Sequence, residues 1–198
     1  YAEFALLYRL LHVSRVPDKQ DNGAESCLEF YHQEALASGS RIRERLSLAV
    51  ENSIKELANG LLKNPANFDL RKDALNGTID SKQYYLHTLR LVYRVLFLLV
   101  IEERKLIYPE RRDEALNKKR SVYYEFYSVQ RLTKLAEKLL YVDPRKTDLW
   151  QSLITTFALF EYEDYGKKLG ISPLGAGIFA PEALGVISEQ LLDNETLL

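Results

Sequence analysis

Apolar residues recur at helical spacing in at least five stretches of this chain, and no stretch alternates apolar and polar residues between hairpin turns. Helical spacing places the apolar side chains on one face, which must be buried against other helices. We therefore predict an all-α fold, an irregular multi-helix bundle. Near the C-terminus the Gly/Pro-rich segment 169–179 is predicted to be extended, and a final short helix to begin near Pro181.

Capping and turn residues give the predicted helix boundaries. The first helix contains Phe4, Leu7 and Leu11, and another covers 127–140. A hydroxyl side chain before an apolar stretch can cap a helix, and the predicted N-caps are Ser40, Ser81 and Thr147. Proline and glycine end helices, and the predicted ends are near Pro17, Ser38-Gly39, Pro65, Pro109 and Gly166. The polar stretch 65–80, with a turn at Asn76-Gly77, is predicted to connect two helices.

The polar run 18–23 has the composition of a loop and is the best candidate for an internal boundary. Residues 1–17 are predicted to be the tail of a preceding domain or a first helix, and residues 24–198 one helical domain. With 198 residues, 46% of them hydrophobic, the chain can bury one substantial core. Because it opens at Tyr1 within an apolar pattern, we expect a fragment of a larger protein.

Charge and cysteine usage limit the partners and the compartment. Lys and Arg number 27 and Asp and Glu number 28, so any contact with DNA must come from a local patch. A single cysteine, Cys27, fits a reducing compartment, and we expect the cytoplasm. The apolar run 86–107 is interrupted by charged residues, which predicts a core helix and no membrane span.

Motifs for known chemistry are not found in the sequence. The segment 64–68, Asn-Pro-Ala-Asn-Phe, follows a helix and lacks the second proline of a methyltransferase motif, so it is interpreted as a helix stop. Glycines 175 and 177 match no nucleotide-binding fingerprint. The charged cluster 161–168 is expected to be solvated surface, and the three histidines, His12, His32 and His87, are too far apart for a zinc site. No catalytic or metal-binding residue is therefore predicted.

Charged residues supply two candidate sites. A basic cluster followed by Tyr123, Tyr124 and Tyr127 suits contacts to DNA phosphates, although a solvated charge run is the alternative. Its members are Arg111, Arg112, Lys118, Lys119 and Arg120. A second set on one helical face is expected to form structural ion pairs, and its members are Arg90, Arg94 and Glu102. A weaker basic set, Arg41, Arg43 and Arg45, hints at a partner because cations oppose the dipole at a helix start.

The strongest apolar stretch carries a family resemblance. Residues 89–109, LRLVYRVLFLLVIEERKLIYP, resemble the helix written LLYRLLFLLYAEERGLLP in type IIG-like restriction-modification proteins. Segments 124–135, 149–160 and 169–181 follow in the family's order, and 40–62 is similar to a helix upstream, so the resemblance covers about four-fifths of the chain. The sequence departs from the pattern at Val100-Ile101, at Lys105, where the family has Gly, and at Gly175-Ala176-Gly177.

The resemblance implies a helical connector between a nuclease domain and an adenine-N6 DNA methyltransferase domain, whose catalytic motifs lie outside it. The implied function is a non-catalytic spacer that positions these modules and contacts the DNA backbone. The implied partners are the flanking domains and double-stranded DNA. S-adenosylmethionine and Mg²⁺ are expected only in the other domains of the parent protein, which methylates DNA with or without cleaving it.

Two other functions are compatible with the residues. A stand-alone helical protein-interaction module would expose an apolar stripe, for which Trp150, Phe157 and Phe160 are the candidates. An enzyme would need a pocket lined by Glu102, Glu103, Arg94 and a tyrosine such as Tyr93.

Overall fold

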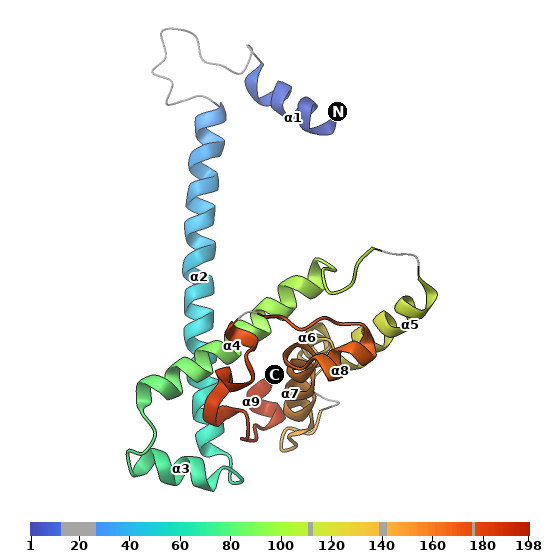
Figure 1. Ribbon diagram of the computed structural model, residues 1–198. Coiled ribbons are helices and arrows are strands. Elements are labelled where there is room, and N and C mark those ends of the chain that lie inside the picture. Colours follow the sequence, from blue (N-terminus) through green and yellow to red (C-terminus); the bar gives the residue numbers. More distant parts are fainter. Residues whose placement is uncertain (13–26, 111–112, 139–141, 176) are drawn as a thin grey trace. The chain divides into compact units, whose positions relative to one another are not determined.

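The computed structural model describes residues 1–12, 27–110, 113–138, 142–175 and 177–198 (Figure 1). These residues are mostly helical and contain no strand, which confirms the all-α prediction. The chain divides into two compact units, Tyr1–Glu51 and Asn52–Leu198. This division falls inside a helix, whereas the boundary predicted at 18–23 lies outside the described residues.

The first unit contains α1 (Ala2–Leu11) and most of α2 (Cys27–Lys63). The prediction that a helix stops at Ser38-Gly39 and that Ser40 caps a new one is wrong, because α2 is continuous through these residues. Glycine inside a helix costs only about 1 kcal/mol relative to alanine, so helix on both sides can continue through it. An ion pair of 2.9 Å between Arg41 and Glu34 also spans this point.

The second unit begins with the end of α2, and its remaining elements follow in chain order. The α-helices are α3 (Phe68–Leu75), α4 (Ser81–Glu103), α5 (Glu114–Val122), α6 (Val129–Ala136), α7 (Asp148–Glu161), α8 (Glu163–Leu169) and α9 (Asn194–Leu197). A π-helical turn, η2 (Tyr123–Tyr127), joins α5 to α6, and two 3₁₀ segments, η4 (Gly177–Phe179) and η5 (Pro181–Ile187), precede α9.

Helix α3 was not predicted, because its eight residues carry a single buried apolar side chain, Leu70. The stop at Pro65 and the turn at Asn76-Gly77 are confirmed, with α2 ending at Lys63 and Gly77 at φ +71°. Helix α4 has its N-cap one residue earlier than predicted. The Asp80 carboxylate accepts a hydrogen bond of 3.1 Å from the Lys82 amide, and aspartate caps a helix as well as the neighbouring serine would.

Helix α7 begins after Thr147 as predicted, although the Thr147 side chain makes no capping hydrogen bond. The predicted end at Gly166 is wrong. Helix α7 ends at Glu161, and Gly166 is buried inside α8, where a Cβ would lie 2.4 Å from the Leu159 carbonyl oxygen. Gly170, at φ +72°, ends α8 instead. The segment that begins at Pro181 is helical, but it is 3₁₀ rather than α.

The core of the second unit consists of leucines from α2, α4 and α7 and a group of aromatic rings. The Phe179 ring lies 6.4 Å from that of Phe157 and 6.0 Å from that of Phe160, and Tyr123 lies 6.0 Å from Phe160. Edge-to-face pairs of this kind add to the stability gained from burial. Segment η4 is therefore held to the bundle by the aromatic packing of Phe179.

Helix α4 is long and apolar enough to cross a membrane by length and composition alone. In the second unit it packs against η5, α6 and η4, and it buries Leu91 and Leu98 in the core. Its buried side chains also include Arg94 and Glu102, which are considered below.

Candidate nucleic-acid interface

Helix α5 carries the basic cluster predicted to contact DNA. The Asp113 carboxylate caps the helix by accepting a hydrogen bond of 3.0 Å from the Ala115 amide. Lys119 and Arg120 occupy the last turn, where cations interact favourably with the helix dipole. The local sequence therefore places an anion at the start of the helix and cations at its end.

The five predicted contact residues differ in their surroundings. Lys118 is exposed and pairs with Glu114 at 3.0 Å. Lys119 is half-buried, and Arg120 donates a hydrogen bond of 3.0 Å to the Pro109 carbonyl while its guanidinium lies 5.7 Å from the Tyr108 ring centroid. Arg111 and Arg112 lie outside the described residues. Among the three members that the structure describes, Lys118 and Lys119 thus have the fewest structural contacts.

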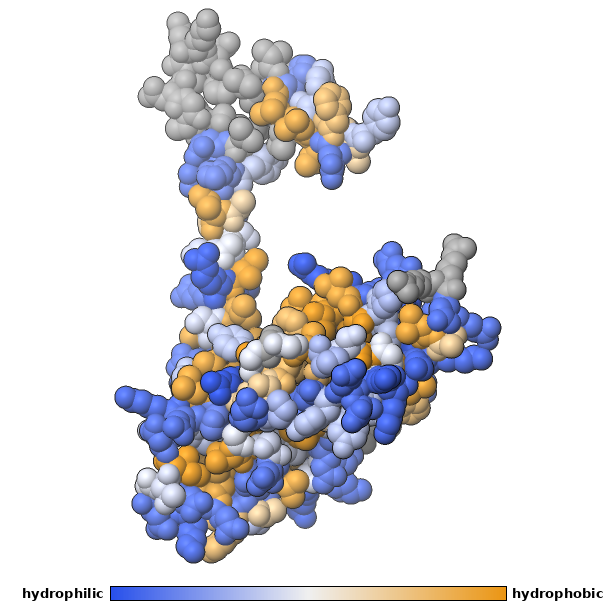
Figure 2. All heavy atoms as spheres, in the orientation of Figure 1, coloured by the Kyte–Doolittle hydropathy of each residue, from blue (hydrophilic) through white to orange (hydrophobic). Residues whose placement is uncertain are grey.

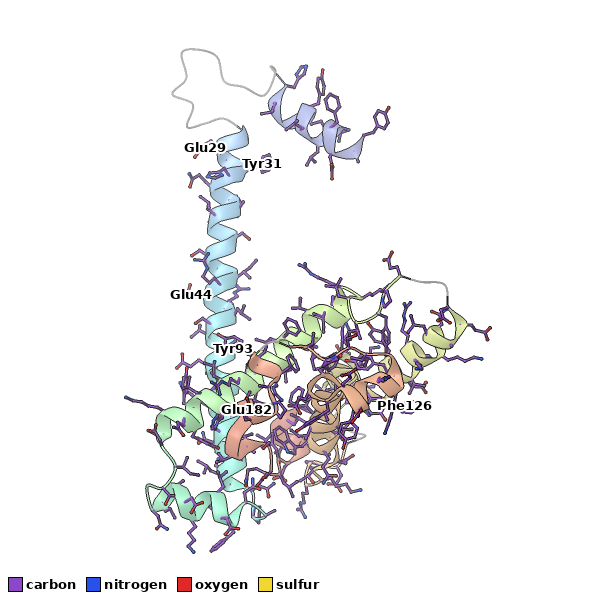
Figure 3. The ribbon with its side chains drawn as sticks, in the orientation of Figure 1. Glu29, Tyr31, Glu44, Tyr93, Phe126 and Glu182 are labelled. Atoms are coloured by element: carbon purple, nitrogen blue, oxygen red, sulfur yellow. The ribbon has the colours of Figure 1, made fainter. Side chains whose placement is uncertain are left out.

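The tyrosines expected to support DNA contact are arranged differently from the prediction. Tyr123 is fully buried, and Tyr124 and Tyr127 are half-buried. The π-helical turn rotates the chain so that Tyr123 enters the core, and Phe126 lies at the surface instead (Figure 3).

Helix α8 packs beside α5 and adds two lysines that sequence reasoning placed in a separate cluster. A Cβ at Gly170, which ends α8, would lie 3.6 Å from the Lys119 side chain. Lys167 and Lys168 are exposed, and the Lys168 ammonium lies 5.6 Å from the Tyr165 ring centroid. Hydrophilic side chains cover both helices on one face of the unit (Figure 2). Only tertiary packing brings α8, which carries these lysines, beside α5, and no local sequence pattern indicates it.

Arg94 is fully buried and has three kinds of partner. Its guanidinium forms an ion pair with Glu161 of α7 and donates to the carbonyl oxygens of Ile178 and Ala180. It also lies 5.2 Å from the Phe157 ring centroid. A buried charge needs such compensation, because its transfer from water is costly. Glu161, expected on a solvated surface, is therefore a structural residue.

Glu102 accepts hydrogen bonds from one side chain of η2 and from two backbone amides at the start of α6. These are the Tyr123 hydroxyl at 2.7 Å, the Val129 amide at 2.8 Å and the Gln130 amide at 2.9 Å. Burial raises the pKa of Glu102, and the three hydrogen bonds oppose this shift. The carboxylate thus caps α6 from a different helix.

Of the three residues expected to form structural ion pairs, Arg94 forms a buried one, with Glu161 of α7. Arg90 donates a hydrogen bond of 3.1 Å to the Ala183 carbonyl, and the other two have the partners given above. Residues eight apart on a straight helix are separated by about 12 Å along its axis, so the shared face does not bring Arg94 to Glu102.

Three buried asparagines that the sequence did not reveal as structural residues connect distant segments. The Asn67 side chain donates to the Leu61 and Leu191 carbonyls and accepts from the Leu191 amide, at 2.7–2.9 Å. Asn64 donates to Asp193, and Asn194 accepts from the Leu149 amide. The motif that ends α2 is thus also an attachment point for the C-terminal segment.

The enzymatic alternative requires a pocket with Glu102, Glu103 and Arg94. A cavity of about 470 Å³ is lined by Glu102 and Glu103 together with Tyr108 and Tyr124. Arg94, however, is occupied by Glu161 elsewhere in the core. Within the described residues, no group of three His, Cys, Asp or Glu side chains is suitably placed to hold a metal ion.

The apolar residues proposed as a docking stripe, Trp150, Phe157 and Phe160, are buried, with 1–2% of their surface exposed. This corrects the expectation, because α7 lies in the core. Large apolar side chains are exposed in the first unit instead, and they include Phe4, Leu7, Tyr31, Ile42 and Leu46.

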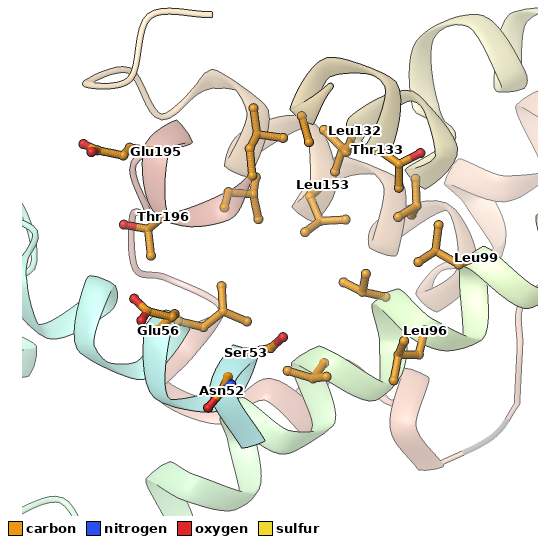
Figure 4. A pocket seen from close by; sticks show the side chains of 17 residues that line it. Asn52, Ser53, Glu56, Leu96, Leu99, Leu132, Thr133, Leu153, Glu195 and Thr196 are labelled. Carbon is orange, nitrogen blue, oxygen red and sulfur yellow. The ribbon is translucent and has the colours of Figure 1, made fainter. Parts of the chain in front are cut away.

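The second unit also has an apolar groove of about 550 Å³ (Figure 4). Leu96, Leu99, Leu132 and Leu153 line its interior, and polar residues such as Glu56 lie among the lining side chains.

A scan against protein-family models found no match. Searches of curated proteins and of solved structures likewise found none.

Proposed function

We propose that this chain is a non-catalytic helical spacer of a DNA restriction-modification protein, which holds nuclease and methyltransferase modules at a fixed separation. The main support for this proposal is that buried polar side chains connect distant segments of the second unit and so fix its geometry. Arg94, Glu102, Asn67 and Asn194 each connect segments distant in sequence. A body that keeps its own geometry is what a spacer requires.

The resemblance of residues 89–109 to the connector helix supplies the family part of the proposal. In this proposal the flanking domains are the partners, S-adenosylmethionine and Mg²⁺ belong to those domains, and the parent protein acts on DNA in the cytoplasm. In this proposal the Gly/Pro-rich segment is the extended part of an irregular bundle, and η4 at its end supplies the Ile178 carbonyl that Arg94 binds.

Contact with the DNA backbone is assigned to Lys118 and Lys119. Each phosphate contact contributes about 0.9 to the slope of log affinity against log salt. We expect the native chain to bind a short duplex without sequence preference, and the change of both lysines to alanine to reduce the slope by about 2. Fluorescence anisotropy across a salt series measures both.

The matched control is the change of Lys72 and Lys82, exposed lysines of α3 and α4, to alanine. It removes the same charge and should leave the slope nearly unchanged. An equal reduction of the salt slope in both variants would show that net charge, and not the position of the lysines on α5, governs DNA binding. A native chain that does not bind at low salt would remove DNA contact from the proposed function.

A second candidate function is a helical protein-interaction module without a nucleic-acid role. The observation that favours it is the set of exposed apolar side chains in the first unit, among them Ile42 at 64% and Leu46 at 53% exposed. The salt series separates the two candidates, since this module would not bind duplex DNA.

A further inference from the structure

The first half of α2 exposes its large apolar side chains, whereas the second half buries Ile54 and Leu61. Ile42 is 64% exposed, whereas Ile54 and Leu61 of the same apolar series are 6% and 0% exposed. Tyr31 and Leu46 lie within about 40° of Ile42 around the helix axis, at 100° per residue. A helical stretch that contains Ser38 and Gly39 gains little stability from its own sequence, so this face needs a partner.

We propose that this face binds a second copy of the chain, with the two α2 helices antiparallel. The helix α1 is too short to cover it. At roughly 1.5 Å per residue, the ten residues of α1 extend about 15 Å, whereas the face from Tyr31 to Leu46 extends about 22 Å. Another α2 has the length to cover the whole face.

Charge complementarity fixes the orientation. Glu34 and Arg41 are seven residues, or two turns, apart and bind each other at 2.9 Å, so both lie on one flank of the apolar face. An antiparallel pairing with Ile42 opposite Tyr31 of the second copy brings Glu34 of each copy beside Arg41 of the other. A parallel pairing would place Arg41 level with Arg41 of the second copy and give neither cross-pair.

The sizes of the facing side chains agree with the same register. Ala35 lies opposite Ser38 of the second copy. The neighbouring Gly39 has no side chain, and its position is open, since a Cβ there would meet nothing within 4 Å in the single chain. The small residues thus occupy the centre of the crossing, and large apolar residues pack on either side of it. Tyr31 and Glu44 project from different sides of α2, so the acidic Glu44 stays outside the interface (Figure 3).

The test is sedimentation equilibrium of the full 198-residue chain with two single-charge variants, Arg41→Glu and Glu34→Arg. Each variant alone places like charges opposite each other, and we expect its dimer to be weaker by about tenfold. In an equimolar mixture, the first variant is acidic at both positions 34 and 41, and the second is basic at both. The mixture should therefore form a heterodimer with the affinity of the native dimer.

This recovery separates an interface from a role inside one helix. Both variants disrupt the Arg41–Glu34 contact within their own α2, and mixing does not repair that contact. Variants that stay weak when mixed, or a native chain that is monomeric at several hundred micromolar, would overturn the proposal. The second result would assign the face to a flanking domain.

A matched pair of apolar substitutions completes the test. Ile42→Ser should weaken the dimer by at least about tenfold, because it removes one apolar contact from each copy. Leu75→Ser, at an 87% exposed position on α3, should leave the dimer unchanged. Equal affinities for the two variants would also overturn the proposal. The inference does not rest on DNA contact, so it stands or fails separately from the proposed function.

Discussion

Arg94 and Glu102 are charged residues of one helix that are buried for different structural reasons. Arg94 binds carbonyl oxygens and Glu161, and it fixes the C-terminal segment onto α4 and α7. Glu102 fixes the start of α6. Loss of one partner from such a contact leaves an uncompensated buried group, which typically costs about 3–5 kcal/mol for an ion pair. Sequence spacing showed that the two share a face, but their partners lie far away in sequence.

The raised pKa of Glu102 predicts a pH dependence of stability. Burial favours the protonated form in the folded chain, so the pKa is higher there than in the unfolded chain, where it is near 4.5. The stability that the folded chain gains from binding this proton is fully present below pH 4.5. It is lost as pH rises through the folded-state pKa of Glu102. The unfolding free energy of the native chain relative to Glu102→Gln should therefore fall as pH rises, by about 1.4 kcal/mol for each pH unit between the two pKa values.

Urea unfolding of both chains between pH 4 and pH 8 measures this difference. Titration of all other groups is shared and cancels in the comparison. A difference that is flat, or that grows with pH, would contradict the prediction.

Lys105 has a left-handed backbone conformation, with φ +55°. For a residue with a Cβ, this left-handed conformation lowers the stability of the fold by about 1 kcal/mol, whereas glycine adopts it without strain. We expect Lys105→Gly to raise the unfolding free energy by about 1 kcal/mol. As control, Arg104→Gly, at φ −80°, should lower stability. Chemical denaturation gives both values, and a loss on Lys105→Gly would show that the lysine side chain makes a larger contribution.

At the scale of elements, periodicity predicted the amphipathic helices and failed where amphipathicity is weak. Helices α4 and α7 have long apolar series, and their first residues were predicted to within one position. Helix α3 buries one apolar side chain and was predicted as a connection. The break predicted at Ser38-Gly39 failed because helix propensity is a small term that neighbouring helical turns outweigh.

The continuity of α2 can be tested with a pair of glycine substitutions. Gly39→Ala should increase helical ellipticity at about 222 nm, because the site is open and alanine gains up to about 1 kcal/mol in a helix. Gly170→Ala should destabilise the chain, since φ is +72° and the Cβ would lie 3.2 Å from Leu116. Unchanged ellipticity for Gly39→Ala would indicate that the helix is interrupted there.

At the scale of the whole molecule, the C-terminal segment holds the second unit together. The Trp150 indole donates a hydrogen bond of 2.7 Å to the Gln190 carbonyl, and Asn67 makes three bonds to the backbone. Removal of the Asn67 side chain leaves buried backbone groups without partners, each of which costs about 1–3 kcal/mol. We expect Asn67→Ala to lower the unfolding free energy by roughly 2–4 kcal/mol.

The fluorescence of Trp150, the single tryptophan, reports this unfolding. The control Asn117→Ala, at an exposed position on α5, should change the unfolding free energy by less than about 0.5 kcal/mol. If the two substitutions cost the same, Asn67 does not connect the segments as the geometry indicates.

By itself, the sequence determined the helical class, the main amphipathic helices and the basic character of α5. These properties depend on residues close together in the chain, and helical periodicity records them directly. Tertiary structure alone decided that Trp150 and Phe157 are buried, that Arg94 pairs with Glu161, and that α8 brings its lysines beside α5. These outcomes depend on which distant segments pack together. Local spacing does not encode that choice, because side chains and backbone from several helices must fill the same space and satisfy the same buried polar groups.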